Sequence, residues 1–128
     1  KYASGLYGPF RDAVNVSLEN SDRKTYQQDW HNAREALTEI RADLSEGADM
    51  IMVKPAITYL DIISKACEIT DVPVAAYHVS GEYAMIKAAS QQGWIDGEQV
   101  ALEQLTAIKR AGANFILTYH AKEIAKIL

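Results

Sequence analysis

One lysine in this chain has surroundings that favour covalent chemistry. Lys54 directly follows a short apolar run, residues 50–53, and directly precedes Pro55. A run of this length predicts a buried strand, and its last side chain would emerge at the carboxyl end, where α/β enzymes place their reactive groups. Burial makes an ammonium costly, so it lowers the pKa of such an amine and frees it to attack a carbonyl carbon. Lys54 is therefore a candidate Schiff-base residue.

Polar and aromatic side chains stand at two further predicted strand ends. The set comprises Tyr77, His78, Ser80, Tyr119 and His120. An amine surrounded by hydroxyl groups suits a keto acid, because the amine condenses with the carbonyl while the hydroxyls hold a carboxylate. Singly, these residues have ordinary explanations: a serine before a glycine usually caps a helix, and a strand tyrosine usually packs in a core. Their combination with a lysine indicates a binding pocket.

A second group of cations lies upstream. Arg11 and Arg23 flank a polar segment, residues 12–30, that has no clear periodicity, and long irregular segments are often lids over active sites. Arginines on a lid can bind a carboxylate with paired donors, although solvated arginines on a surface loop would give the same pattern. Lys1 supplies another amine. If it lies beside Lys54, charge repulsion lowers the pKa of at least one of the two.

Helical and extended patterns alternate from residue 33 onward. The sequence predicts helices over residues 33–45, 57–69, 81–92, 98–111 and 121–128, and strands over residues 50–53, 74–79 and 115–119. Gly47 stands where the first of these helices needs its C-cap. Apolar strands joined by helices predict a parallel sheet with right-handed crossovers, which is an α/β fold.

An internal repeat narrows the choice between α/β folds. Residues 46–54 match residues 111–119 position by position in character, which places Tyr119 where the first copy has Lys54. Repeated units of one barrel explain this match, and both side chains would then project from strand ends onto the same face. A doubly wound open sheet has the same alternation, but its nucleotide-binding versions carry a glycine fingerprint or a phosphate loop that this sequence lacks.

Length and composition are those of one folding unit or part of one. The chain has 128 residues, 48% of them hydrophobic, and a net charge of −4 without a basic stripe. We therefore expect neither nucleic acid nor a membrane as a partner. The single cysteine, Cys67, excludes an internal disulfide and fits a reducing compartment. Because the chain opens on Lys1 within a glycine-rich and aromatic loop, we expect a portion of a longer protein.

Several short motifs are recognisable as a set. They are Lys1-Tyr2-Ala3-Ser4, Tyr7-Gly8-Pro9-Phe10-Arg11, Met52-Val53-Lys54-Pro55, Tyr59-Leu60-Asp61, Tyr77-His78-Val79-Ser80-Gly81-Glu82-Tyr83-Ala84-Met85, Lys109-Arg110-Ala111-Gly112-Ala113 and Leu117-Thr118-Tyr119. In this order and spacing they resemble the porphobilinogen synthase family, also called 5-aminolevulinate dehydratase. The resemblance covers essentially the whole chain.

The resemblance implies a fold and an activity. The family folds as a (β/α)8 TIM barrel, and this chain would be its C-terminal part, with parallel strands six to eight of the barrel. Residues 1–32 would form an active-site loop and lid region, and residues 33–128 the βα units. The family is a lyase that condenses two molecules of 5-aminolevulinate into porphobilinogen through a Schiff base, a step of haem and chlorophyll synthesis. Family members assemble as homo-oligomers, commonly octamers.

The resemblance also implies roles for individual residues. Lys54 matches the lysine that holds the first substrate as a Schiff base, and Lys1 matches its second lysine. The residues implied to bind the first substrate's carboxylate or line its pocket are Ser80, Tyr119, Tyr7 and Phe10. Those implied to bind the second carboxylate are Arg11, Arg23 and Gln27.

Only the family resemblance implies that the protein binds metal ions. The family uses zinc or magnesium at a catalytic site whose segment lies outside this chain, and Glu39 falls at the position of a glutamate that holds an allosteric magnesium through water. A lone helical glutamate is more often simply solvated. The implied location is the cytoplasm, or the plastid in a photosynthetic eukaryote.

Two alternative functions follow from the residues themselves. An aldolase-like barrel could use Lys54 on a different keto compound. Alternatively, these residues alone could be a non-catalytic half-barrel that self-associates, because half a barrel exposes sheet edges and apolar strand faces. We therefore expect the isolated chain to have negligible activity.

Overall fold

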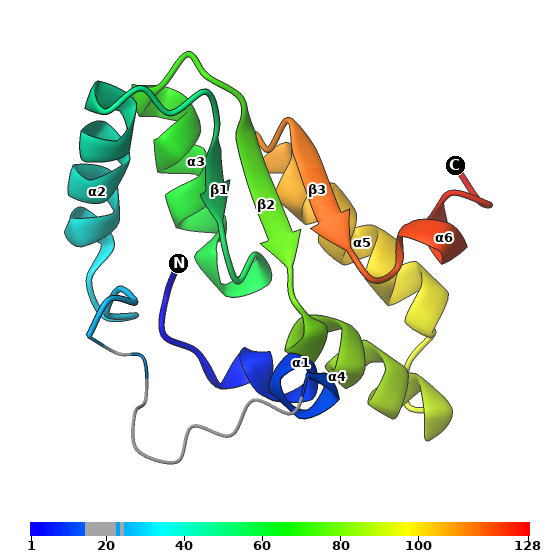
Figure 1. Ribbon diagram of the computed structural model, residues 1–128. Coiled ribbons are helices and arrows are strands. Elements are labelled where there is room, and N and C mark those ends of the chain that lie inside the picture. The colour runs from blue at the N-terminus through cyan, green and yellow to red at the C-terminus, as the bar shows by residue number, and fades with distance from the viewer. Residues whose placement is uncertain (15–22, 24) are drawn as a thin grey trace.

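A three-stranded parallel sheet organises the computed structural model, which describes residues 1–14, 23 and 25–128 (Figure 1). Its strands are β1 (Ile51–Val53), β2 (Val74–His78) and β3 (Phe115–Thr118), in the order β1-β2-β3. Val53 pairs with Ala76, and Ala76 with Ile116, so the three strands are in parallel register. The predicted α/β fold with parallel neighbouring strands is confirmed.

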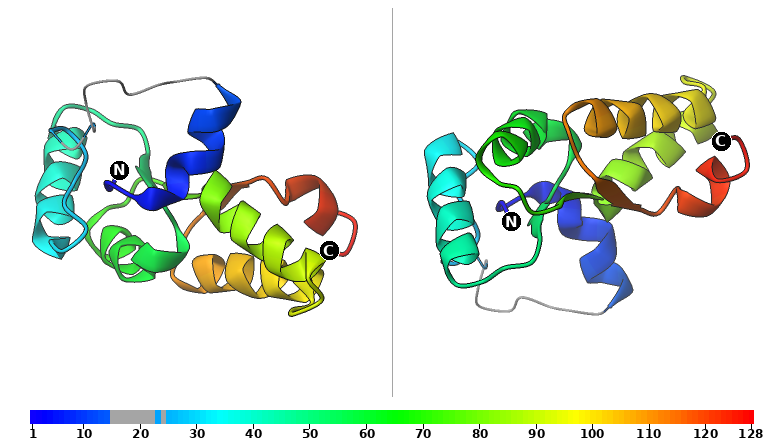
Figure 2. Two further views of the ribbon diagram at one scale, coloured as in Figure 1. Left: turned by 90° about the horizontal axis from the view of Figure 1, so that it is seen from below. Right: turned by 90° about the horizontal axis from the view of Figure 1, so that it is seen from above.

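Helices connect the strands, and two of them cover one face of the sheet. They are η1 (Gly5–Tyr7), α1 (Gly8–Ala13), α2 (Ala33–Ser45), η2 (Ile57–Tyr59), α3 (Leu60–Ile69), α4 (Ser80–Gln91), α5 (Gly97–Arg110) and α6 (Ala121–Ile124). In Figures 1 and 2, α3 and α5 cover the same face of the sheet, while α1 and α4 lie beyond the carboxyl ends of the strands. None of the helices in the described ranges is long and apolar enough to cross a membrane.

Helix ends explain the internal repeat. After α2, Gly47 adopts φ +95°, its N–H donates to the Leu44 carbonyl, and the Ala48 N–H donates to the Asp43 carbonyl. After α5, Gly112 adopts φ +113° and the same pair of bonds recurs one repeat later. Both are Schellman motifs, which need a residue at positive φ and therefore favour glycine. Each motif turns the chain from a helix into the following strand.

The core lies between the sheet and its covering helices. Ile63 of α3 and Ile108 of α5 are fully buried, and they belong to the same apolar cluster as Val53 and Val74. The other face of the sheet differs, because Met52 is 37% exposed and Phe115 is 39% exposed. Side chains alternate across a strand, so one face packs against helices and the opposite face stays open.

Several local predictions were wrong in kind or in extent. Residues 5–13 were expected as a loop, but they form η1 and α1, where Pro9 occupies the first turn and needs no N–H partner. The last helix, expected over 121–128, ends at Ile124. The strands β2 and β3 each end one residue earlier than expected. Residues 15–22 and 24 of the expected lid lie outside the described residues.

Candidate functional site

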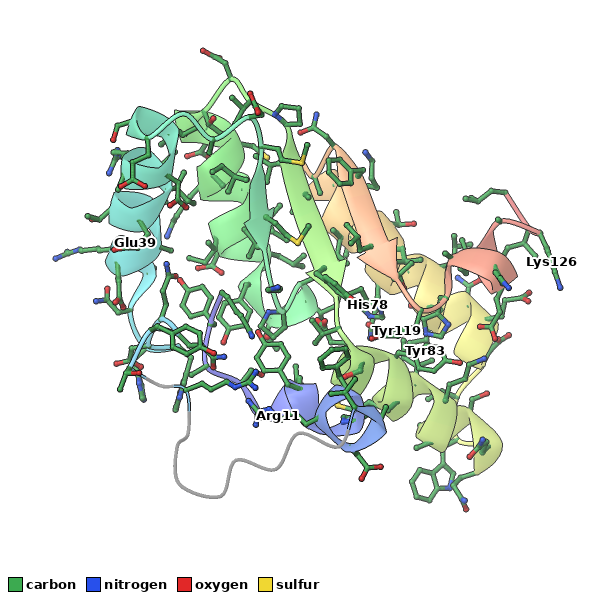
Figure 3. All side chains as sticks on the ribbon, viewed as in Figure 1. Arg11, Glu39, His78, Tyr83, Tyr119 and Lys126 are labelled. Atoms are coloured by element: carbon green, nitrogen blue, oxygen red, sulfur yellow. The ribbon has the colours of Figure 1, made fainter. Side chains whose placement is uncertain are left out.

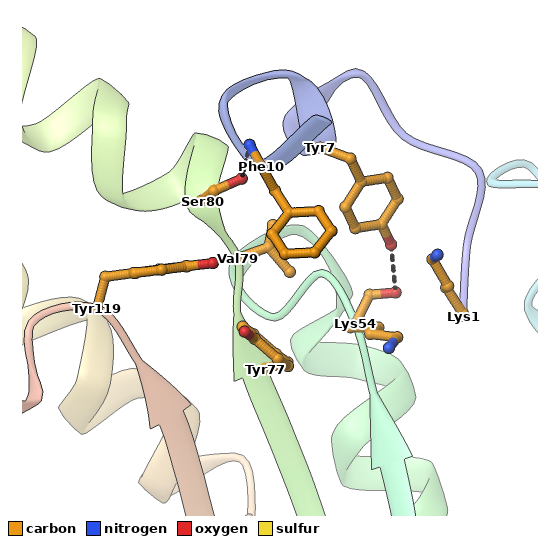
Figure 4. A pocket seen from close by; sticks show the side chains of 8 residues that line it. All are labelled: Lys1, Tyr7, Phe10, Lys54, Tyr77, Val79, Ser80 and Tyr119. Atoms are coloured by element: carbon orange, nitrogen blue, oxygen red, sulfur yellow. Dashed lines mark hydrogen bonds between the residues drawn. The ribbon is translucent and has the colours of Figure 1, made fainter. Parts of the chain in front are cut away.

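A cavity of about 100 Å³ opens at the carboxyl ends of the strands (Figure 4). Its lining residues are Lys1, Tyr7, Phe10, Lys54, Tyr77, Val79, Ser80 and Tyr119. Each of the three strands contributes, since Lys54 follows β1, Tyr77 belongs to β2 and Tyr119 follows β3. The structure therefore brings together most of the residues that the sequence singled out, although they are up to 118 positions apart.

Two amines share this cavity. The Lys1 ammonium lies 4.8 Å from the centre of the Tyr7 ring, and the Lys54 ammonium lies 5.8 Å from that of Tyr77. Burial lowers the pKa of Lys1, and the positive charges of Lys54, Arg23 and Arg11 lower it further. Lys1 consequently holds its proton less tightly than a free lysine does.

Main-chain hydrogen bonds hold the two lysines together. The Tyr2 N–H donates to the Lys54 carbonyl at 3.1 Å. The Tyr7 hydroxyl lies 3.0 Å from the Tyr2 carbonyl and 3.1 Å from the Lys54 carbonyl, and it can donate its one proton to either. Burial, as the main cause, raises the pKa of Tyr7, so this hydroxyl keeps its proton. The chain at Lys1 is thereby attached to the end of β1.

Ser80 presents its hydroxyl at the opposite wall. It accepts a hydrogen bond from the Phe10 N–H at 3.1 Å and donates to the Leu6 carbonyl at 3.5 Å, the long limit for such a bond (Figure 4). Gly81 makes this contact possible, since a Cβ there would lie 2.4 Å from the Leu6 carbonyl oxygen. The weak donation to Leu6 leaves the Ser80 proton available to a stronger acceptor such as a carboxylate.

Tyr119 closes the third side of the cavity. Its ring centre lies 6.5 Å from that of Tyr77 and 5.7 Å from that of Tyr83. The neighbouring Tyr77 hydroxyl, followed by partial burial, raises the pKa of Tyr119. Its hydroxyl is therefore protonated at neutral pH and can donate into the cavity, toward which it points in Figure 4.

The two upstream arginines, Arg11 and Arg23, lie near the cavity but do not line it. The Arg11 guanidinium lies 5.7 Å from the centre of the Tyr7 ring, and both Arg11 and Arg23 are close enough to lower the pKa of Lys1. Gln27 is buried, and among the described residues its amide nitrogen has no hydrogen-bond partner. A buried donor without an acceptor is costly, and a carboxylate oxygen would satisfy it.

Glu39 lies apart from this cavity. It is exposed on α2, on the far side from Tyr119 in Figure 3, and lines a separate space with Asp43 and Lys1. Within residues 1–14, 23 and 25–128, no three histidine, cysteine or carboxylate side chains come together in a group able to hold a metal ion. Magnesium prefers six oxygen ligands, so Glu39 alone does not make a metal site.

The structure places two expected pocket residues outside the lining and adds one unexpected residue to it. His78 and His120 point away from the cavity and are buried; His78 bonds Gln104 at 3.0 Å and Thr118 at 3.2 Å, and burial lowers its pKa. Side chains alternate along a strand, so His78, which directly follows the cavity-lining Tyr77, faces the opposite side of the sheet. The added residue is Val79, which lines the cavity, whereas Glu82 is buried and lies outside the lining. A glutamate three residues after Val79, the residue that directly precedes α4, was the available signal for a capping role.

The arrangement suits an anionic keto compound. Two amines and two nearby guanidinium groups provide positive charge, while the Ser80 and Tyr119 hydroxyls provide neutral donors. A ligand with a carbonyl near Lys54 and a carboxylate near Ser80 would satisfy both ends.

Comparison with known proteins identifies relatives of the whole chain. The family model for delta-aminolevulinic acid dehydratase matches residues 1–127. The delta-aminolevulinic acid dehydratases of Streptomyces coelicolor and Synechococcus elongatus are 64% and 61% identical to it over 128 residues. The chain spans 38% and 39% of the length of these two relatives.

A solved structure agrees with the sequence comparison. The crystal structure of delta-aminolevulinic acid dehydratase (porphobilinogen synthase) from Toxoplasma gondii, in complex with the reaction product porphobilinogen, superposes with a TM-score of 0.97 at 53% identity. The match covers 100% of this chain and 37% of that one. The predicted fold, a segment of this family's barrel, is confirmed.

Proposed function

The chain belongs to the delta-aminolevulinic acid dehydratase family, and we propose that the whole protein condenses two molecules of 5-aminolevulinate into porphobilinogen. The observation that carries the proposal is the pair of amines, Lys1 and Lys54, at one cavity whose other wall bears hydroxyl donors. Two keto substrates need two binding sites, and two lysines can engage both. Because this chain spans under half of its relatives, the activity is proposed for the whole protein.

Lys54 is proposed to form the covalent bond to the first substrate. Its neutral Nζ attacks the keto carbon, a C–N bond forms, and the carbonyl oxygen leaves as water to give the Schiff base. Lys1 is proposed to engage the second substrate in the same cavity. Its lowered pKa supports this role, because a larger fraction of Lys1 is neutral, and hence nucleophilic, at a given pH.

The carboxylates are proposed to bind at two different places. The Ser80 and Tyr119 hydroxyls would hold the carboxylate of the first substrate between the rings of Tyr7 and Phe10. The second would lie among the polar groups outside the cavity, which are Arg11, Arg23 and Gln27. The Gln27 amide nitrogen, which has no hydrogen-bond partner within the described part of the chain, supports this assignment, since a carboxylate would supply an acceptor.

The metal, the assembly and the location remain family-based proposals. The described residues do not form a metal site, so we derive no step through a metal and place the catalytic zinc or magnesium outside this chain. An allosteric magnesium at Glu39 would need ligands beyond that single carboxylate, through water or from elsewhere. A homo-oligomer and a cytoplasmic location are proposed for the whole protein on the same grounds.

Borohydride trapping tests the proposal directly. The full-length protein is incubated with 5-aminolevulinate, reduced with borohydride and digested, and the adduct is located by peptide mass analysis. We expect an adduct on Lys54 and the loss of that adduct in Lys54→Met, because methionine has no amine with which to form a reducible Schiff base. Lys65→Met on α3, away from the cavity, is the matched control and should keep the adduct.

The same experiment distinguishes the aldolase-like alternative. An enzyme for another keto compound would form little adduct with 5-aminolevulinate and release no porphobilinogen. An adduct found elsewhere than on Lys54 would rule out the assignment of this residue.

A further inference from the structure

One buried carboxylate connects two parts of the site without touching the cavity. Glu82, on the first turn of α4, is 1% exposed. Its Oε1 accepts from the Ile57 N–H at 2.6 Å and the Ala56 N–H at 3.1 Å, and its Oε2 accepts from the Val79 N–H at 2.6 Å. All three donors are main-chain amides.

These amides belong to the two chain segments that adjoin Lys54 and Ser80. Ala56 and Ile57 begin the turn that follows Lys54 and Pro55, whereas Val79 directly precedes Ser80. A single side chain therefore joins the end of β1 to the end of β2, over 25 positions of sequence. The two segments it joins carry the proposed Schiff-base amine and the proposed carboxylate-binding hydroxyl.

We propose that Glu82 is a positioning residue that sets the separation between the Lys54 amine and the Ser80 hydroxyl. In this way it selects keto acids whose carbonyl and carboxylate are the right distance apart. The inference rests on the proposed function, because it assumes that one substrate reaches both residues.

The negative charge of Glu82 strengthens its hydrogen bonds to the main-chain N–H groups and so holds the two segments firmly. A carboxylate that accepts several main-chain N–H groups forms stronger and shorter bonds than a neutral acceptor does. Glu82 lies at the N-termini of both α4 and η2, where unpaired N–H groups point outward and the positive end of the helix dipole favours an anion. Removing the Glu82 carboxylate leaves buried N–H groups unpaired. The end of β1 and the end of β2 would then no longer be held at a fixed distance from each other.

Two substitutions separate this role from simple capping. Glu82→Gln keeps the size of the side chain but points an amide donor at a main-chain donor. Glu82→Asp keeps the charge and can still accept from Val79, but it is one methylene too short to span to Ala56 and Ile57. Glu98→Gln is the matched control, because Glu98 is also a first-turn glutamate but is exposed on α5.

The test compares two ketones in the full-length protein. We measure the rate of borohydride-trapped adduct at Lys54 with 5-aminolevulinate and with aminoacetone, which has the ketone and amine but no carboxylate. In Glu82→Gln and Glu82→Asp the rate with 5-aminolevulinate should fall about 10²-fold, the cost of a misplacement near 1 Å, while the aminoacetone rate changes little. Glu98→Gln should alter neither rate.

An equal fall for both ketones would overturn the proposal, because a general loss of structure does not depend on the carboxylate. Amide hydrogen exchange supplies a readout that needs no substrate: Ala56, Ile57 and Val79 should exchange faster in Glu82→Gln, and unchanged exchange at all three would also overturn it. Absence of any wild-type adduct with 5-aminolevulinate would instead contradict the proposed function, and the exchange result would still decide whether Glu82 joins the two segments.

Discussion

The two faces of the sheet do different work. On the helix-covered face, Val53, Val74 and Ala76 are at most 5% exposed and pack against α3 and α5. On the open face, Met52 of β1 and Phe115 of β3 are exposed. Side-chain alternation puts Lys54, Tyr77 and Tyr119 on this same open face, at the carboxyl ends of the strands, where the cavity lies.

The helix-covered face supplies stability, whereas the open face supplies the reactive groups. Buried apolar contacts hold the strands in place on one side, so the other side can present amines and hydroxyls with no packing role of its own. The open face also exposes the apolar side chains of Met52 and Phe115, which favours association with more protein.

The largest expected effect comes from leaving the open face uncovered. The 128 residues expressed alone should self-associate and form negligible porphobilinogen, because apolar strand faces seek a partner and the implied metal segment lies elsewhere. Size-exclusion chromatography and a porphobilinogen assay measure both. Met52→Glu should reduce the association, whereas Met85→Glu, on α4 and 56% exposed, is the matched control and should not. A monomer with family-like turnover would contradict the comparison.

A core substitution should affect stability without affecting chemistry. In the full-length protein, Ile63→Ala should lower the free energy of unfolding by about 2–5 kcal/mol, because Ile63 is fully buried and the substitution leaves a cavity. Denaturant unfolding measures this, and kcat per folded molecule should be unchanged. The control Leu128→Ala, which changes a side chain that is 92% exposed, should shift the free energy of unfolding by no more than about 0.5 kcal/mol. A large fall in kcat for Ile63→Ala would show that the two faces are not separable.

The smallest effect concerns the protonation of Lys1. Its folded pKa lies below the unfolded value of 10.5, so the folded state binds the proton less tightly. Stability from this group is therefore lowest below the folded pKa and rises as pH increases from that pKa toward 10.5. Removing a neighbouring charge with Lys54→Met should raise the pKa of Lys1, as measured by the pH dependence of its modification by an amine reagent. Lys65→Met should leave it unchanged.

Much of the fold was predictable because it depends on local pattern. The helix 33–45 agrees with α2 at both ends, since Asn32 caps its first turn and Gly47 ends it. The loop predicted at residues 5–13 was wrong, because glycine, proline and aromatic residues conceal a short helix that tertiary contacts stabilise. Propensity is a weak guide where a segment packs against another element, as η1 does against Gly81.

The candidate site was predictable in its members but not in its supports. Lys54 and Tyr119 could be identified because strand ends and an internal repeat can be recognised in the amino-acid sequence. The directions of His78 and His120 could not, because one residue of shift at a strand end moves a side chain to the other face. Glu82 was missed for a different reason: two of its three partners, Ala56 and Ile57, come from a distant segment, and nothing in its local sequence requires burial.

The sequence by itself determined the order of strands and helices, the glycines that turn helices into strands, and the family, because these are properties of short segments and their spacing. Only the tertiary structure decided which residues share the cavity, how Lys1 comes beside Lys54, and that a buried carboxylate joins the segments carrying Lys54 and Ser80. The physical reason is that hydrogen bonds and charge interactions depend on distances of a few ångströms, and parallel pairing of distant strands sets those distances.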